Sequence, residues 1–188
     1  MGQLQTYLQL LLRWNQRINL TSIREPEECV TRHFGECFFL KSHEQIRGRL
    51  LDIGSGAGFP GLALKLVFPD CEATLLEPVA KKRAFLKEVA RCCEIEGVEV
   101  RPERLEEIPA LGLRFDVATA RAVARPETLA IQAGSVLDSS GWIHFWTTRS
   151  QAEKLEKAGV GISWTRRLPI PLSHEREILT GTITSQTP

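Results

Sequence analysis

Residues 50–61 are the part of this sequence whose types and spacing most directly suggest chemistry. A short apolar run, Leu50–Ile53, carries one acid, Asp52, near its end. Three glycines then follow in the pattern G-x-G-x-G: Gly54, Gly56 and Gly58. Glycine lets a backbone turn tightly and approach a ligand closely. A strand ending in such a loop brings it to the carboxyl edge of a parallel sheet, where ligands bind in open α/β folds.

The spacing of the glycines separates two classes of nucleotide ligand. Dinucleotide-binding loops follow G-x-G-x-x-G and hold a pyrophosphate at a helix N-terminus. S-adenosylmethionine has no pyrophosphate but carries a positive ammonium and a positive sulfonium, for which Asp52 is suited. Glu77 follows the next apolar run, about twenty residues after the loop, where an acid binds ribose hydroxyls. We therefore expect S-adenosylmethionine, with an NAD-dependent oxidoreductase as the disfavoured alternative.

A cluster of basic residues follows Glu77. It consists of Lys81, Lys82, Arg83, Lys87 and Arg91, with Glu88 as the single acid among them. On charge alone, a solvated helix face is the favoured interpretation of such a run.

The elements around these residues alternate between strand and helix. Residues 3–16 predict a helix with Leu4, Leu8 and Leu11 on one stripe and Tyr7, Leu11 and Trp14 beside it. A second helix is expected after Pro26. Further helices are expected at 60–68 and after Pro126. Another is expected after Glu77, with Leu86, Val89 and Cys93 on its buried face. Strands are expected at 50–53, 73–76, 98–101, 115–119, 142–146, 159–168 and 177–183.

This order predicts an α/β fold with a doubly wound, mostly parallel sheet. The last two strands have no predicted helix between them, so they should close one edge as an antiparallel pair. We expect one domain over residues 1–188, with a small helical extension at 1–47 and the cofactor-binding core at 48–188.

Composition indicates an ordinary globular protein. The 188 residues are 43% hydrophobic and 25% charged, with a formal net charge of +1, so no overall field draws the chain to polyanions. The five cysteines have no Cys-x-x-Cys spacing and are expected to be free, mostly buried thiols rather than metal ligands. With no signal peptide or spanning segment visible, we expect a cytoplasmic protein that does not enter membranes.

Beyond the loop, residues 10–183 resemble the bacterial 16S ribosomal RNA guanine-N7 methyltransferases, also called the glucose-inhibited division protein B family. The motifs that carry the resemblance are Trp14-Asn15-x-x-x-Asn19-Leu20-Thr21, Arg32-His33, residues 52–61, Lys82-Arg83-x-Phe85-Leu86, Arg104-x-Glu106-Glu107, Phe115-Asp116-x-x-x-x-Arg121-Ala122 and Glu175-Arg176. The resemblance implies a Rossmann-like class I methyltransferase that uses S-adenosyl-L-methionine to methylate N7 of a guanine in 16S rRNA. The implied partner is this RNA or the small ribosomal subunit, and the implied state is a monomer.

The resemblance also implies roles for individual residues. The implied cofactor contacts are Gly54, Phe59, Glu77, Leu105, Glu106 and Arg121, and the loop pattern described above adds Asp52, Gly56 and Gly58. Apart from the resemblance, the charge and position of Lys81, Lys82, Arg83 and Arg125 suit them to contact RNA. No general base is expected, because guanine N7 has a lone pair and no hydrogen. Arg121 and His33 are candidates for positioning the substrate, although such a histidine is more often structural.

Two departures from the family pattern keep other functions open. The chain has His33-Phe34-Gly35-Glu36-Cys37 where the family commonly has His-x-x-Asp-Ser, and Thr147-Thr148 where many members have lysine and glycine. The alternatives are a methyltransferase-fold protein that binds the cofactor without turnover and a methyltransferase that acts on another RNA.

Overall fold

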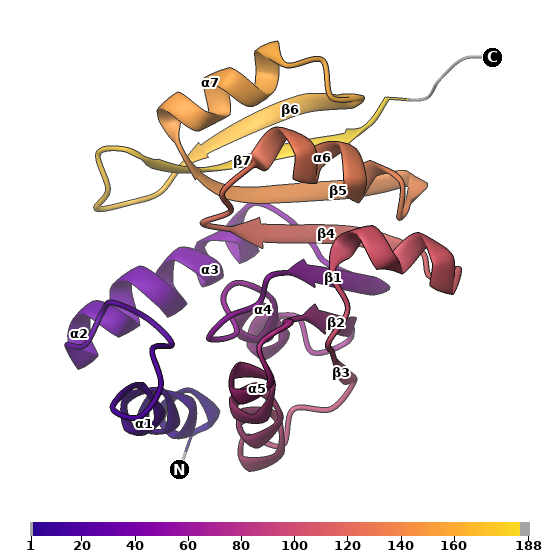
Figure 1. The fold of residues 1–188 in the computed structure, drawn as a ribbon. Coiled ribbons are helices and arrows are strands. Elements are labelled where there is room, and N and C mark those ends of the chain that lie inside the picture. Colours follow the sequence, from indigo (N-terminus) through magenta and orange to yellow (C-terminus); the bar gives the residue numbers. More distant parts are fainter. Residues whose placement is uncertain (1, 185–188) are drawn as a thin grey trace.

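The computed structural model describes residues 2–184, which form a seven-stranded sheet with helices on both faces (Figure 1). The strand order is β3-β2-β1-β4-β5-β7-β6. The strands are β1 (Arg49–Ile53), β2 (Glu72–Leu76), β3 (Val98–Arg101), β4 (Phe115–Arg121), β5 (Leu137–Thr148), β6 (Ile162–Pro169) and β7 (Arg176–Ile183). The five strands from β3 to β5 are mutually parallel, whereas β7 runs antiparallel to both of its neighbours. The expected doubly wound sheet with an antiparallel edge is confirmed.

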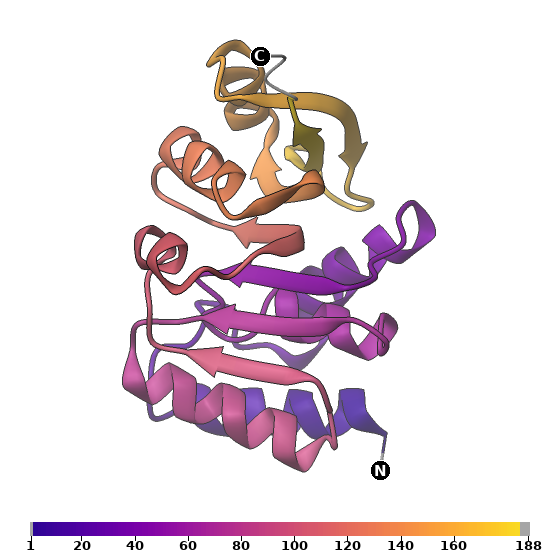
Figure 2. The same ribbon diagram turned by 90° about the vertical axis from the view of Figure 1, so that its right-hand side faces the viewer.

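Helices cover both faces of the sheet, and Figure 2 shows the same ribbon turned by 90°, with the strands stacked one above another. The first helix is α1 (Gln3–Asn15). A continuous helical segment follows, made of α2 (Pro26–Cys29), η1 (Val30–Gly35), α3 (Glu36–Phe38) and η2 (Phe39–Ser42). The remaining helices are α4 (Gly61–Val67), α5 (Ala80–Cys92), η3 (Leu105–Leu111), α6 (Pro126–Gly134) and α7 (Arg149–Lys157). Successive strand residues point to opposite faces. In β1, Leu50 therefore packs with α1, α4 and α5, while Leu51 packs with η3, α6 and α7.

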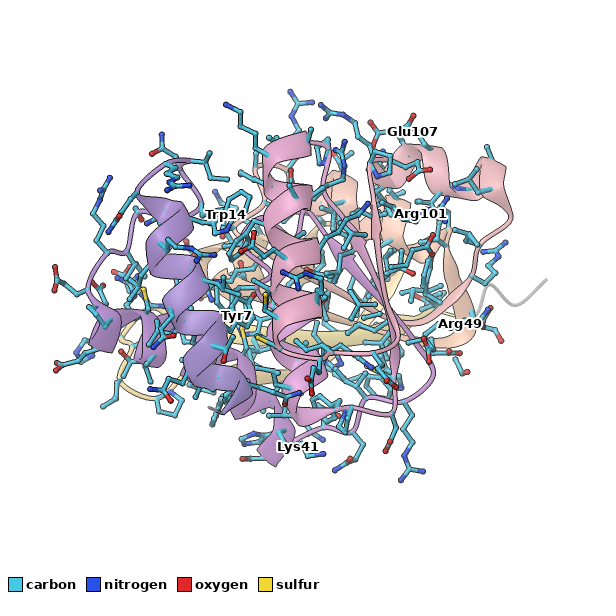
Figure 3. The ribbon with its side chains drawn as sticks, turned by 90° about the horizontal axis from the view of Figure 1, so that it is seen from below. Tyr7, Trp14, Lys41, Arg49, Arg101 and Glu107 are labelled. Atoms are coloured by element: carbon cyan, nitrogen blue, oxygen red, sulfur yellow. The ribbon has the colours of Figure 1, made fainter. Side chains whose placement is uncertain are left out.

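The N-terminal helix α1 lies beside α5 and is part of the core (Figure 3). Tyr7 and Leu11 are fully buried, and Trp14 packs edge-on against Phe85 of α5, with ring centroids 5.8 Å apart. The prediction of an apolar stripe through Leu4 on the buried face of this helix is wrong in part, because Leu4 is 37% exposed. The buried face of α1 is centred on Tyr7, since this face meets both α5 and the loop after β1.

The structure also contains two helices that the sequence analysis did not predict. The first is η3, which begins at Leu105, and the second is α7, which separates β5 from β6. The strand β5 is also longer than expected, because it extends from Leu137 to Thr148. The five cysteines are unpaired and all but Cys92 are buried, as predicted. Among residues 2–184, no helix is both long and apolar enough to cross a membrane.

Candidate functional site

The glycine loop connects β1 to α4 and has one open side and one packed side. Gly54, Gly56 and Gly58 all have positive φ angles, of +71°, +55° and +88°, which favour glycine. A Cβ atom on Gly54 would meet nothing within 4 Å, whereas one on Gly58 would lie 2.1 Å from the hydroxyl of Tyr7. Gly54 therefore faces free space beside the sheet edge, and Gly58 is the point at which the loop packs against α1.

Glu77 joins this loop to the next one. Its side chain is 4% exposed; Oε2 accepts a hydrogen bond from Gly56 N (2.9 Å), and Oε1 accepts one from Val79 N (2.8 Å). Ser55 N also donates to the carbonyl of Leu76 (2.9 Å). The carboxylate therefore lies next to the loop, where the sequence analysis expected it, and each oxygen retains capacity for a further donor.

Asp52 lies beneath the loop and is fully buried. Its Oδ1 accepts a hydrogen bond from the hydroxyl of Thr119 in β4 (2.9 Å), and its carboxyl group packs under Gly61 at the start of α4. Burial raises the pKa of Asp52 to about 6, although hydrogen bonds from Ser55, Thr119 and Gly61 act in the opposite direction. In this position Asp52 supports the loop from below and is not exposed to a ligand, so a direct contact with the cofactor remains a prediction.

Phe59 and His33 belong to a stack of rings that connects the loop to the N-terminal helices. The ring of Phe59 stacks on Tyr7 at 5.5 Å and on His33 at 4.6 Å. His33 Nε2 lies 2.8 Å from the hydroxyl of Thr21. Burial, together with the positive charges of Arg121 and Arg32, lowers the pKa of His33 to about 3. His33 is therefore neutral at physiological pH, and its contacts are those of a structural residue.

Arg121, at the end of β4, takes part in a buried charge cluster. One of its guanidinium nitrogens lies 3.3 Å from Glu36 and donates to the carbonyl of Arg32 (2.9 Å). Glu36 is 4% exposed and also pairs with Arg176 at 2.7 Å, while its carbonyl accepts a hydrogen bond from Trp146. The cluster thus links the N-terminal helical segment to the ends of β4, β5 and β7.

A cavity of about 570 Å³ lies beside this cluster rather than beside the glycine loop. Arg32, Glu36 and Arg176 are among the residues that line it, together with Phe38 and Phe39. No residue of the glycine loop is among those that line this cavity, so the cavity is distinct from the space beside Gly54.

The remaining predicted residues occupy three different settings. Leu105 is buried at the start of η3, whereas Glu106 is exposed. Arg83 donates to the backbone carbonyls of Glu77 (3.0 Å) and Pro78 (2.6 Å), so part of its guanidinium is already engaged. The other three predicted RNA contacts, Lys81, Lys82 and Arg125, are exposed or half-buried.

The structure gives roles to three residues for which the sequence analysis predicted none. Tyr7 packs on Gly58 and donates a hydrogen bond to the carbonyl of Ala57 (2.6 Å). Glu36 was noted only as a departure from a motif, and nothing in its spacing predicts two arginine partners from distant strands. Thr148 accepts a hydrogen bond from Gln151 N and caps α7. The spacing Thr148-x-x-Gln151 is a capping-box pattern and could have predicted this helix.

Comparison with known proteins agrees with this arrangement. The sequence model of a family described as rRNA small subunit methyltransferase G matches residues 1–169. A ribosomal RNA small subunit methyltransferase G from Caldanaerobacter subterraneus is 46% identical over 125 residues, which cover 64% of this chain and 52% of that protein. One from Staphylococcus saprophyticus is 35% identical, covering 85% of this chain and 69% of that protein. The chain thus spans about half to two thirds of the length of these curated relatives.

Solved structures share the fold at low identity. An S-adenosylmethionine-dependent methyltransferase from Aquifex aeolicus aligns with a TM-score of 0.66 and 16% identity, over 82% of this chain and 93% of that one. A ribosomal protein L11 methylase from Lactobacillus delbrueckii aligns with a TM-score of 0.65 and 15% identity, over 82% of this chain and 78% of that one. These likenesses show the fold alone. The match over residues 1–169, with the 35% identity to the Staphylococcus saprophyticus protein over 85% of this chain, places the chain in the rRNA small subunit methyltransferase G family.

Proposed function

We propose that this protein transfers a methyl group from S-adenosylmethionine to N7 of a guanine in 16S rRNA, within the free RNA or the small ribosomal subunit. The observation that carries the proposal is the glycine loop with Glu77 clamped against it, found in a chain of the rRNA small subunit methyltransferase G family. We further propose a cytoplasmic monomer.

The residues at the loop fit this cofactor. Gly54 leaves space for a ligand to approach the backbone, and Glu77 offers a buried carboxylate for the two ribose hydroxyls. Leu105 and Glu106 start the segment beyond β3 and would border the adenine, and Arg121 would lie near the transferable methyl group. Gly56 and Gly58 shape the loop, and Phe59 and Asp52 support it from the protein side.

Methyl transfer to guanine N7 requires the protein mainly to orient the two reactants. S-adenosylmethionine supplies a methyl group on a sulfonium, which is a good leaving group, and the N7 lone pair needs no deprotonation. Holding two reactants in line can lower a barrier by about 7–11 kcal/mol. The environment of His33 fits this scheme, since His33 is buried and neutral with its Nε2 directed to Thr21. We therefore assign Arg121 and His33 to positioning and structure.

A cofactor-binding protein without turnover is the second candidate, and Thr147-Thr148 is the feature that motivates it. Both threonines have structural partners, because Thr147 bonds to the side chain of Gln151 (3.0 Å) and Thr148 caps α7. This departure therefore has a local explanation that does not require loss of activity.

Calorimetric titration is the first test. S-adenosylmethionine should bind with micromolar-range affinity, about −8 kcal/mol, and NAD should not bind. Binding of NAD without S-adenosylmethionine would overturn the cofactor assignment. Cofactor binding without any methyl transfer to small-subunit RNA would favour the second candidate.

A further inference from the structure

A groove separates the loop after α1 from the first turn of α5, and its lining is strongly basic. The groove encloses about 370 Å³. Arg17 and Arg24 line it from the loop, and Lys81 and Lys82 line it from α5. No acidic residue is among its lining residues.

Within the described part of the chain these four cations lack acidic partners, which sets them apart from many arginines of the same protein. Within residues 2–184, none of the four has a carboxylate oxygen within 4.0 Å of its charged nitrogens. By contrast, Arg13 pairs with Glu88 at 2.6 Å only one turn before Arg17. Four unpaired cations around one concave surface concentrate positive potential there, although the net charge of the chain is only +1.

The loop that carries Arg17 and Arg24 is held in one conformation by Asn15. The side chain of Asn15 is buried; its Oδ1 accepts from Leu20 N (2.9 Å) and Thr21 N (3.0 Å), and its Nδ2 donates to Thr21 O (3.0 Å). Thr21 is in turn bonded to His33 at 2.8 Å. A loop fixed in this way presents its arginines at little further entropic cost on binding. This gives a structural role to the Trp-Asn-x-x-x-Asn-Leu-Thr motif, which the cofactor site does not use.

The groove also adjoins the predicted cofactor site. Val79 lines the groove and is 46% exposed, and its backbone N–H donates to Glu77 at 2.8 Å. A polyanion lying in the groove would therefore run past the acid that we assign to the cofactor ribose.

We propose that this groove binds the sugar-phosphate backbone of the substrate RNA, with Arg17 and Arg24 acting together with Lys81 and Lys82. This inference rests on the proposed function and extends it to residues of the N-terminal extension. Guanidinium and ammonium groups bind phosphates without regard to base identity, so the groove fixes the register and orientation of the RNA and leaves base selection to other residues. Asn15 is a positioning residue that acts through the loop.

The test is a salt series of RNA binding with three double variants of the whole chain. Arg17→Ala with Arg24→Ala removes the loop cations, and Lys81→Ala with Lys82→Ala removes the helix cations. Lys154→Ala with Lys157→Ala is the matched control, because both lysines are exposed on α7 and the change in charge is the same. Binding of two RNA probes, polyuridylate and a stem-loop of small-subunit RNA, is measured by fluorescence anisotropy. The affinity for S-adenosylmethionine is measured in parallel.

With polyuridylate, each groove variant should flatten the plot of log affinity against log salt by about 1.4, since each phosphate contact on a single strand contributes about 0.7 to the slope. The control should keep the slope of the unmodified protein, and S-adenosylmethionine affinity should be unchanged in all three variants. Equal slopes in the groove variants and the control would overturn the groove assignment and leave the proposed function standing. An unmodified chain that binds S-adenosylmethionine but neither RNA would overturn the RNA substrate and the groove together.

Discussion

At the residue scale, Glu77 combines two tasks in one buried carboxylate. It accepts backbone hydrogen bonds from Gly56 and Val79, and we propose that it also accepts the ribose hydroxyls of the cofactor. Its place after the second strand was predictable from the sequence, because an acid about twenty residues after a glycine loop is typical of nucleoside sites. The hydrogen bonds from the loop to Glu77 were not predictable, since they depend on how two loops approach each other.

Replacing Glu77 tests this pair of tasks. Glu77→Ala should weaken S-adenosylmethionine binding by about one to two orders of magnitude, because hydrogen bonds to a charged group typically contribute about 1.5–3 kcal/mol. Calorimetry measures the change, and circular dichroism checks that the fold is retained. Glu96→Ala is a suitable comparison, because Glu96 is exposed, is not among the predicted cofactor contacts and should have a smaller effect. An unchanged dissociation constant for Glu77→Ala would remove this residue from the cofactor site.

His33 makes the stability of the fold depend on pH. Its pKa is lowered to about 3, so the unfolded chain binds a proton near pH 6.5 that the folded chain does not bind. The contribution of neutral His33 is fully present above pH 6.5 and is lost as the pH falls toward 3, at up to about 1.4 kcal/mol per pH unit. His33→Gln removes this titration. As the pH is lowered, the unfolding free energy of the variant should therefore fall less steeply than that of the unmodified protein.

Urea denaturation between pH 7 and pH 4 measures this difference. The buried His144, whose pKa is lowered to about 4, contributes equally to both proteins and cancels. His43→Gln is the control for replacing a histidine by glutamine, because His43 is exposed. A parallel pH dependence for His33→Gln and the unmodified protein would mean that His33 is accessible to protons in the folded state.

At the element scale, the glycine loop and α1 depend on each other. The sequence predicts both elements, because G-x-G-x-G after a short apolar run and apolar residues at helical spacing are strong local signals. It does not predict their contact, in which Tyr7 reaches the loop at Gly58. The helix α7 was also missed, because its short apolar stripe of Ala152 and Leu155 is weak compared with its charged residues.

Two alanine substitutions distinguish the two sides of the loop. Gly54→Ala and Gly58→Ala both place a side chain at positive φ, which costs on the order of 1 kcal/mol. Gly58→Ala should be several times more destabilising, because its Cβ would overlap the hydroxyl of Tyr7, and adding Tyr7→Phe should restore part of the loss. Gly54→Ala should instead reduce cofactor affinity with a modest loss of stability.

Denaturation midpoints and calorimetry on the same four proteins provide the measurement. Similar destabilisation by the two single alanine substitutions would contradict the distinction between an open and a packed side. Unchanged cofactor affinity in Gly54→Ala would mean that the ligand approaches the protein elsewhere.

At the scale of the whole molecule, the N-terminal helices share one hydrophobic core with α4 and α5. Removing residues 1–24 would expose the surface that Tyr7, Leu10 and Leu11 cover, and each such side chain contributes about 1.5–3 kcal/mol when fully buried. Because domains are stable by only about 5–15 kcal/mol, the truncated chain should lose cooperative unfolding. Leu4→Ala, at an exposed position of α1, should have little effect in the same experiment. A truncated chain that unfolds at the original midpoint would mean that α1 is dispensable.

The sequence predicted the sheet, its antiparallel edge and the loop that carries the site. Those features depend on short-range patterns, such as apolar runs and glycine spacing. The Glu36 cluster, the stack of Phe59 on His33 and the groove beside Arg17 join residues far apart in the chain, and no local pattern specifies such contacts. The division into an extension at 1–47 and a core at 48–188 remains a prediction, as do the individual ligand contacts.

The central claim is methyl transfer to guanine N7, and the direct measurement is to map the methyl group. Small ribosomal subunits that lack the modification are incubated with the protein and labelled S-adenosylmethionine, and N7-methylguanine is located by chemical scission of the RNA chain. The account predicts label at N7 of one guanine of 16S rRNA, and much less label with Glu77→Ala at limiting cofactor. Label on another atom or another RNA, or no label in a protein that binds S-adenosylmethionine, would contradict it.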